Sequence, residues 1–286
     1  MYRNIEQLLE AAAIEAKPLA QIILQSEEKL TDSSLAQIDA QMRTNWDVMQ
    51  KSVTKALHTA QAMTPPLIAG QAQKQEAYSS GDTLCGKPFN HMMAMAFSAS
   101  EVNAAMGRIC AAPTAGACGI LPAVVRTVAD KRGSSEAEIA DALLVAAGFG
   151  AIITANATIS GAEGGCQAEC GTAAAMAAAA AVTLCGGTAE MCANAVAISL
   201  INCMGLICDP VAGLVQLPCS FRNASQSANA LASADMALAG QVSVIPPDEV
   251  IDAMYRVGKS LPSSMRETAE GGIAATPTGR KIAHEL

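Results

Sequence analysis

The chain has 286 residues, of which 51% are hydrophobic but only 3% aromatic, and it carries a formal net charge of −8. A core of this size must be built from Ala, Val, Ile, Leu and Met, and small helix-forming residues let helices pack closely, so we expect an all-α protein. The negative charge disfavours nucleic acids and anionic membranes as partners, although it does not exclude a small anionic substrate.

The sequence offers no clear targeting or membrane signal. Residues 1–16 are acidic and amphipathic and lack the basic start and cleavage site of a signal peptide. The apolar stretches 142–159 and 172–184 are interrupted by Gly and Asn or are too short, which favours buried core helices over membrane spans. Ten cysteines in such a chain indicate a reducing compartment, so we expect a cytoplasmic protein without disulfides.

The pattern of residues 1–62 predicts helices. Residues 1–16 and 33–57 place apolar side chains at helical spacing, while Pro18 and the run Thr64-Pro65-Pro66 interrupt the pattern. We therefore predict an N-terminal helical segment, residues 1–62, that packs on a second unit, residues 63–286. An ordinary place within one fold remains the alternative for the first segment.

A polar stretch follows at 68–86 and is predicted to be irregular, with Lys74 and Tyr78 as its chemically interesting members. A solvated surface loop is the alternative reading. Residues 88–106 are predicted to form a helix with a methionine stripe of the kind that packs in cores. The same helix contains His91, and a lone histidine is more often structural than catalytic.

Residues 109–125 combine a small-residue turn with the start of an apolar helix. Thr114 and Gly116 in this turn leave backbone N–H groups free at a helix N-terminus, an arrangement that suits a carboxylate or phosphate. The spacing matches neither a Walker A motif nor a dinucleotide fingerprint. A tight corner between two helices would explain the same residues.

The remaining chain is predicted to be helical up to its tail. We expect two helical stretches in 134–160, a helix over 171–200 broken at Gly186-Gly187, and helices at 224–240 and 248–258. Ser160 leads directly towards Cys166. The Gly/Thr/Pro-rich tail at 266–281 supplies Thr276 and Thr278, which either line a polar site or belong to a solvated loop.

Three of the ten cysteines stand apart by their context. Cys166, Cys208 and Cys219 each lie in turn-forming sequence, whereas most of the others lie in or beside apolar helical stretches; Cys170 is ambiguous. Their spacing fits neither a zinc finger nor a common ferredoxin motif, so spacing alone indicates a metal only weakly. Three ligands from distant turns would leave one coordination position of a cluster open, and an open iron is a Lewis acid.

Several long motifs resemble one family. The segments NAAMGRICAAPTAGACGILPA (103–123), ISGAEGGCQAECG (159–171), GLICDPVAGLVQLPC (205–219), RNASQSANALASADMALAG (222–240), DEVIDAMYRVG (248–258) and RETAEGGIAATPTG (266–279) are similar to the alpha subunit of the iron–sulfur L-serine dehydratases. The resemblance extends over essentially the whole chain. It implies an all-helical catalytic domain in which Cys166, Cys208 and Cys219 hold a [4Fe–4S] cluster with one open iron.

The resemblance also implies an activity and a partner. The reaction would be β-elimination of L-serine to pyruvate and ammonia without pyridoxal phosphate. A beta subunit would carry a Ser-Ser-His-Thr motif that this chain lacks. Cys170 stands where the family would place an apolar residue, and the C-terminal KIAHEL contains no cysteine that could cover the open iron.

The roles of individual side chains follow as expectations. Lys74 is our candidate base, which requires burial or nearby positive charge to lower its pKa from about 10; a histidine of the beta subunit is an equal contender. Thr114, Gly116, Ser160, Thr276 and Thr278 are candidate substrate-binding residues.

Other activities remain open at this point. The same scaffold could desulfidate L-cysteine or deaminate L-threonine. Two alternative hypotheses belong to other functional classes: a redox-sensing binding module without turnover, and a structural zinc protein.

Overall fold

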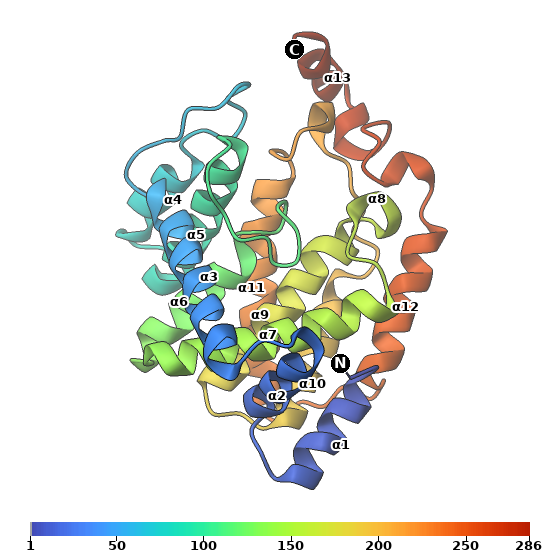
Figure 1. Cartoon of the computed structure of the whole chain (residues 1–286). Coiled ribbons are helices and arrows are strands. Elements are labelled where there is room, and N and C mark those ends of the chain that lie inside the picture. Colours follow the sequence, from blue (N-terminus) through green and yellow to red (C-terminus); the bar gives the residue numbers. More distant parts are fainter. Residues whose placement is uncertain (1) are drawn as a thin grey trace.

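The computed structural model describes residues 2–286, which form thirteen α-helices and no β-strand. The prediction of an all-α protein is confirmed (Figure 1). The α-helices are α1 (Ile5–Glu15), α2 (Leu19–Thr31), α3 (Leu35–Lys55), α4 (Gln71–Ser79), α5 (Gly86–Ala104), α6 (Ile120–Arg132), α7 (Glu136–Asn156), α8 (Gly161–Gly164), α9 (Thr172–Leu184), α10 (Ala189–Cys203), α11 (Cys219–Leu238), α12 (Pro247–Ser260) and α13 (Pro277–His284). Short helical turns are η1 (Gln167–Gly171), η2 (Val211–Gly213), η3 (Ser263–Met265) and η4 (Gly272–Ala275).

Helix α9 lies at the centre of the fold, and its alanines are the reason. Every residue of α9 except Thr183 is buried, and α6, α7, α10 and α11 all pack against it. Side chains as small as Ala let several helix backbones approach one helix from different sides. The helix that follows the Cys166 segment is therefore almost completely enclosed by its neighbours.

The N-terminal helices join the same core. Ile5, Leu8 and Val53 are fully buried in a cluster that continues through α9 and α10. Both carboxylate oxygens of Asp248, in the first turn of α12, accept hydrogen bonds from the backbone N–H groups of Ile5 and Glu6, at 2.8 and 3.0 Å. The start of α1 is thus tied to the start of α12, and a boundary near residue 62 stays a prediction.

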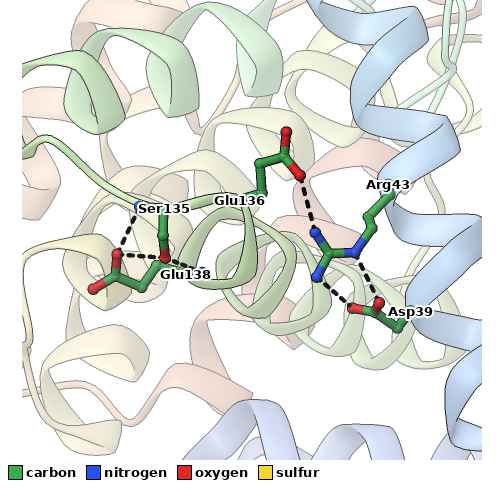
Figure 2. A network of polar contacts seen from close by, with 5 residues as sticks. All are labelled: Asp39, Arg43, Ser135, Glu136 and Glu138. Carbon is green, nitrogen blue, oxygen red and sulfur yellow. Dashed lines mark hydrogen bonds and ion pairs between the residues drawn. The ribbon is translucent and has the colours of Figure 1, made fainter.

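A polar network joins α3 to α7 at the surface (Figure 2). Arg43 donates to Asp39 on its own helix at 2.8 Å and to Glu136 at the start of α7 at 3.2 Å. Beside it, Ser135 and Glu138 form a capping box that satisfies free N–H groups at the N-terminus of α7. These exposed ion pairs contribute little free energy individually, so they fix the orientation of α7 more than they stabilise it.

The stretch 68–86 is not irregular as predicted, because it contains α4. No side chain of its own caps this helix. Instead the buried carboxylate of Glu101, on α5, accepts hydrogen bonds from the N–H groups of Gln61, Gly70 and Ala72 at 3.2, 3.1 and 2.8 Å. A carboxylate at a helix N-terminus is favourable, but this one comes from 29 residues further along the chain, where local sequence gives no sign of it.

One further prediction about elements was wrong, and two helices, α2 and α13, had no counterpart among the predicted elements. The stretch 134–160 contains one helix, α7, rather than two, and the Met176 side chain packs against Gly150 within it. Residues 19–31 form α2, which lies within the segment 1–62 predicted to be helical. Pro18 separates it from α1 and occupies its N-cap position, where the missing N–H costs nothing. The tail ends in α13, which the Thr276 side chain caps.

Helix α7 is also the one described helix with the length and apolar composition of a membrane span, but 61% of that apolar window is buried inside the protein. Its packing partners α9 and α2 cover it. It has the character of a core helix, as the sequence indicates.

Candidate functional site

The three cysteines singled out from the sequence occupy three different kinds of backbone. Cys166 lies between α8 and the π-helical turn η1, which leads into α9. Cys208 forms an isolated parallel bridge with Arg266, and Cys219 is the first residue of α11. All three are buried, with exposed fractions of 1%, 3% and 7%. π-Helical turns inside α-helices occur frequently at functional sites.

The structure brings these three thiols into one electrostatic neighbourhood. Burial raises the pKa of Cys219 to about 12, and the charge of Cys166 raises it as well. Burial also raises the pKa of Cys208, again with contributions from the charges of Cys166 and Cys219. Because a thiol must lose its proton to bind a metal, cluster binding here would release protons.

Cys166 has the opposite tendency. Its sulfur lies 3.2 Å from that of Cys170, and hydrogen bonding within this pair lowers the pKa of Cys166, with help from the Arg222 guanidinium. The same contact, together with burial, raises the pKa of Cys170. Of this pair, Cys166 is therefore the thiol whose ionised form is favoured. A carboxylate oxygen of Glu169 and the sulfurs of Cys166 and Cys170 all lie within 4.8 Å of one another, so these three ligand atoms could hold a metal ion.

Cys208 is held in place by its backbone and its neighbours. Its N–H donates to the carbonyl of Met265 at 2.9 Å, and its carbonyl accepts from the N–H of Glu267 at 2.7 Å. The next residue, Asp209, accepts from the Arg222 guanidinium at 2.6 Å and from the N–H of Ile273 at 2.7 Å. The C-terminal segment is thus fixed against the cysteine loop on both sides of Cys208.

Gln167 fixes the segment that follows Cys166. It is fully buried, its backbone N–H donates to Leu206 O at 2.9 Å, and its side chain bonds both Gly205 N, at 2.7 Å, and Met254 O, at 2.9 Å. These bonds join η1 to the loop before Cys208 and to α12. Cys166 and Cys208 are therefore positioned relative to each other by one buried amide side chain.

Asn223 has the equivalent role beside Cys219. This fully buried side chain donates to the carbonyls of Gly116 and Cys219 at 2.7 and 2.9 Å and accepts from the N–H of Gly119 at 2.8 Å. The turn at 113–119, predicted to bind a carboxylate or phosphate, is thereby attached to the first turn of α11.

Two of the predicted substrate-binding residues lie against Glu169. The Thr114 hydroxyl donates a hydrogen bond to the Glu169 carboxylate, and a Cβ on Gly116 would collide with the same carboxylate. Burial raises the pKa of Glu169, while the Thr114 hydrogen bond acts in the opposite direction. The turn 113–119 and the Cys166 segment therefore meet at this carboxylate.

The other predicted residues are more scattered. Ser160 is half-buried and precedes Gly161, where a Cβ would stand 2.9 Å from the sulfur of Cys208. Thr276 caps α13, and Thr278 is exposed on that helix. Lys74 is exposed on α4, so the burial that we required of a lysine base is not provided by the described part of this chain alone.

Sequence reasoning missed the residues that organise this site, namely Gln167, Glu169, Asp209, Arg222 and Asn223. One signal was available, because charged or amide residues stand within four positions of each of the three cysteines in a chain that is only 15% charged. Chemically, the arrangement is a set of buried thiols and a carboxylate that is compatible with a metal cluster.

Comparison with known proteins connects this site to a family. The model of the family described as "Serine dehydratase alpha chain" matches residues 15–274. The "Probable L-serine dehydratase, alpha chain" of Bacillus subtilis (strain 168) is 45% identical over 287 residues, which cover all of this chain and 95% of that protein.

Two further relatives agree. The "L-serine dehydratase, alpha chain" of Peptoniphilus asaccharolyticus is 47% identical, with 93% of this chain and 91% of that protein covered. The "L-serine dehydratase TdcG" of Escherichia coli (strain K12) is 41% identical over 88% of this chain but only 57% of its own length. The resemblance seen in the motifs thus extends over nearly the full length, and the chain belongs to the serine dehydratase alpha chain family.

Proposed function

We propose that this chain is the alpha subunit of an iron–sulfur L-serine dehydratase, which eliminates water from L-serine and releases pyruvate and ammonia without pyridoxal phosphate. The observation that carries the proposal is the meeting of Cys166, Cys208 and Cys219, from three distant segments, in one buried neighbourhood of a chain that belongs to this family.

The residues present fit a [4Fe–4S] cluster better than a single ion. Only Cys166 joins the compact group of ligand atoms with Glu169 and Cys170, and ligands on different irons of a cluster stand further apart than ligands on one ion. Gly161 leaves room beside the Cys208 sulfur. The buried hydroxyl of Ser220, next to Cys219, has no hydrogen-bond partner, as expected of a polar group that faces a cluster.

In this proposal Cys166, Cys208 and Cys219 hold the cluster. An iron without a protein ligand would supply Lewis-acid chemistry, which makes the substrate hydroxyl a better leaving group. The chain's own residues shape the surroundings. Gln167 and Asn223 hold the cysteine segments in register, and Thr114 together with Gly116 places the turn 113–119 against Glu169.

The α-proton must be taken by a base, and two candidates remain. Lys74 is exposed on α4, so it would act as a base only if a partner covers it. A histidine of the beta subunit is the other candidate. Both candidates place the completion of the site at an interface between subunits.

The relatives support a partner of this kind. Two relatives of nearly the same length are named alpha chains, and the chain spans only 57% of TdcG. We propose that a separate beta subunit supplies the remaining part, including the Ser-Ser-His-Thr motif, and that the assembled enzyme is cytoplasmic.

The test is purification without oxygen, with the chain alone and with its beta subunit, followed by assays on L-serine, L-cysteine and L-threonine. We expect turnover of L-serine that needs both subunits and exceeds the other two rates. Preference for L-cysteine or L-threonine would replace the substrate assignment. A cluster-loaded complex that turns over none of the three would contradict the enzyme assignment and favour a redox-sensing module.

A further inference from the structure

Arg266, the backbone bridge partner of Cys208, is a half-buried residue whose guanidinium has one buried nitrogen without a partner. Its Nε atom is buried and has no hydrogen-bond partner, and in residues 2–286 no carboxylate forms an ion pair with its side chain. A buried N–H donor without an acceptor is unfavourable, since its desolvation is not compensated. A group that supplies the missing acceptor is therefore expected at this position.

The second guanidinium of the site cannot take that acceptor as readily. Arg222 already donates to the carbonyl of Ile207 at 2.8 Å and to the Asp209 carboxylate at 2.6 Å. Asp209 is 2% exposed, so this ion pair is well shielded from solvent. Of the two, Arg266 is the one with free donors.

The backbone directs Arg266 towards the cysteine site. Cys208 and Arg266 are partners in an isolated parallel bridge, and residues paired in this way project their side chains to the same side. The neighbouring Glu267 carboxylate and the Cys208 sulfur both lie against Gly161, at 3.4 and 2.9 Å from the position that a Cβ would take. The bonds of Asp209 and Met265 keep the segment in this place.

We infer that Arg266 binds the carboxylate of the amino-acid substrate. This inference rests on the proposed function and specifies how its site recognises an α-amino acid. A guanidinium presents two parallel N–H donors that match a carboxylate, with both geometric specificity and a strong charge-assisted interaction. Thr276 fits this role less well, because its hydroxyl already donates to Ile273 O at 2.8 Å and accepts from Gly279 N at 3.1 Å.

The experiment uses the alpha–beta holoenzyme with Arg266→Met, Arg266→Lys and, as a control, Arg280→Met, which changes an exposed arginine of the same C-terminal segment. Loss of a charge-assisted bidentate pair should raise the KM for L-serine about 10- to 150-fold in Arg266→Met, with kcat changed much less. The inhibition constant of L-serinamide, which lacks the carboxylate, should be the same in Arg266→Met as in wild type. The inhibition constant of D-serine should rise by about the same factor as the KM for L-serine. Arg280→Met should behave as wild type.

Iron and sulfide content and the visible spectrum of each variant are measured first. An unchanged KM in a cluster-loaded Arg266→Met protein would overturn the inference. An equal loss of D-serine and L-serinamide inhibition would also do so. If both Arg266 variants lack the cluster, the residue is structural and the inference is wrong. Absence of serine turnover in the wild-type holoenzyme would instead count against the dehydratase assignment. In that case, the binding of D-serine, followed through the visible spectrum of the cluster in wild type and Arg266→Met, would still test the role of Arg266.

Discussion

Asn223→Ala is the perturbation that separates the scaffold of the site from its ligands most clearly. The side chain is not a proposed cluster ligand and makes its three hydrogen bonds to backbone groups of Gly116, Gly119 and Cys219. Alanine keeps the helical backbone of α11 and is a better helix former. Any loss of stability therefore comes from the unpaired backbone groups and the small cavity.

The magnitude follows from counting those groups. The N–H of Gly119 and the carbonyl of Gly116 both lose their contact with Asn223 in a buried region, and each unsatisfied buried group costs about 1–3 kcal/mol. The carbonyl of Cys219 also loses the hydrogen bond from Asn223, but it lies in the first turn of α11 and is not counted among the unsatisfied groups. The expected loss is about 2–6 kcal/mol, a large share of the roughly 5–15 kcal/mol by which a protein domain is stable.

The assay is urea unfolding of the anaerobic chain together with its iron content. We expect Asn223→Ala to lower the unfolding midpoint and the iron content together, because Cys219 is one turn from Asn223. The control is Asn202→Ala, since the exposed Asn202 bonds only Asn229, and a change within about 0.5 kcal/mol is expected there. A destabilisation below about 1 kcal/mol in Asn223→Ala would refute the assigned role.

Three further predictions test other parts of the site. Gly161→Ala places a Cβ 2.9 Å from the sulfur of Cys208, so iron content should fall several-fold while the fold, followed by far-ultraviolet circular dichroism, is retained. Glu101→Ala removes the acceptor of three N–H groups around the start of α4; it should cost about 3–5 kcal/mol in urea unfolding, whereas Glu101→Gln should recover part of this. Burial raises the pKa of Glu169, so its contribution to the unfolding free energy is largest below the ordinary carboxyl pKa and is lost as pH rises through the raised value. The cluster-free Glu169→Gln protein should therefore gain stability relative to wild type between pH 4 and pH 7.5.

Each of these has a result that contradicts it. Full iron content in Gly161→Ala would mean that Cys208 is not a ligand or that the loop moves freely. Equal stabilities of wild type and Glu101→Ala would mean that α4 needs no cap from α5. A difference between wild type and Glu169→Gln that does not change with pH would show that the carboxyl is not perturbed by its surroundings.

The helices were predictable where their causes are local. The alanines of α9 and the glycine pair at 186–187 that ends it are visible in the sequence, and both are found in the structure. Helix α4 was missed because its N-terminal acceptor, Glu101, comes from another helix. The sequence prediction divided α7 in two, whereas the structure shows one helix in which Met176 packs against Gly150.

The site shows the same division. Turn-forming sequence and family motifs single out Cys166, Cys208 and Cys219, and the structure brings them together as a buried set. The bonds of Gln167 and Asn223 and the unpaired guanidinium of Arg266 depend on contacts between segments far apart in the chain, which no local pattern encodes. The role of Cys170 follows from neither source, although its sulfur lies 3.2 Å from that of Cys166.

The most direct test of the central claim is iron and sulfide analysis, with electron paramagnetic resonance, of anaerobically purified wild type and single Cys→Ala variants. We predict about four irons and four sulfides in wild type and severe loss in variants at Cys166, Cys208 and Cys219. The control Cys192→Ala, which changes a buried thiol in α10, should keep the full content. A full cluster in any of the three ligand variants, or zinc in place of iron in the wild-type protein, would contradict the account.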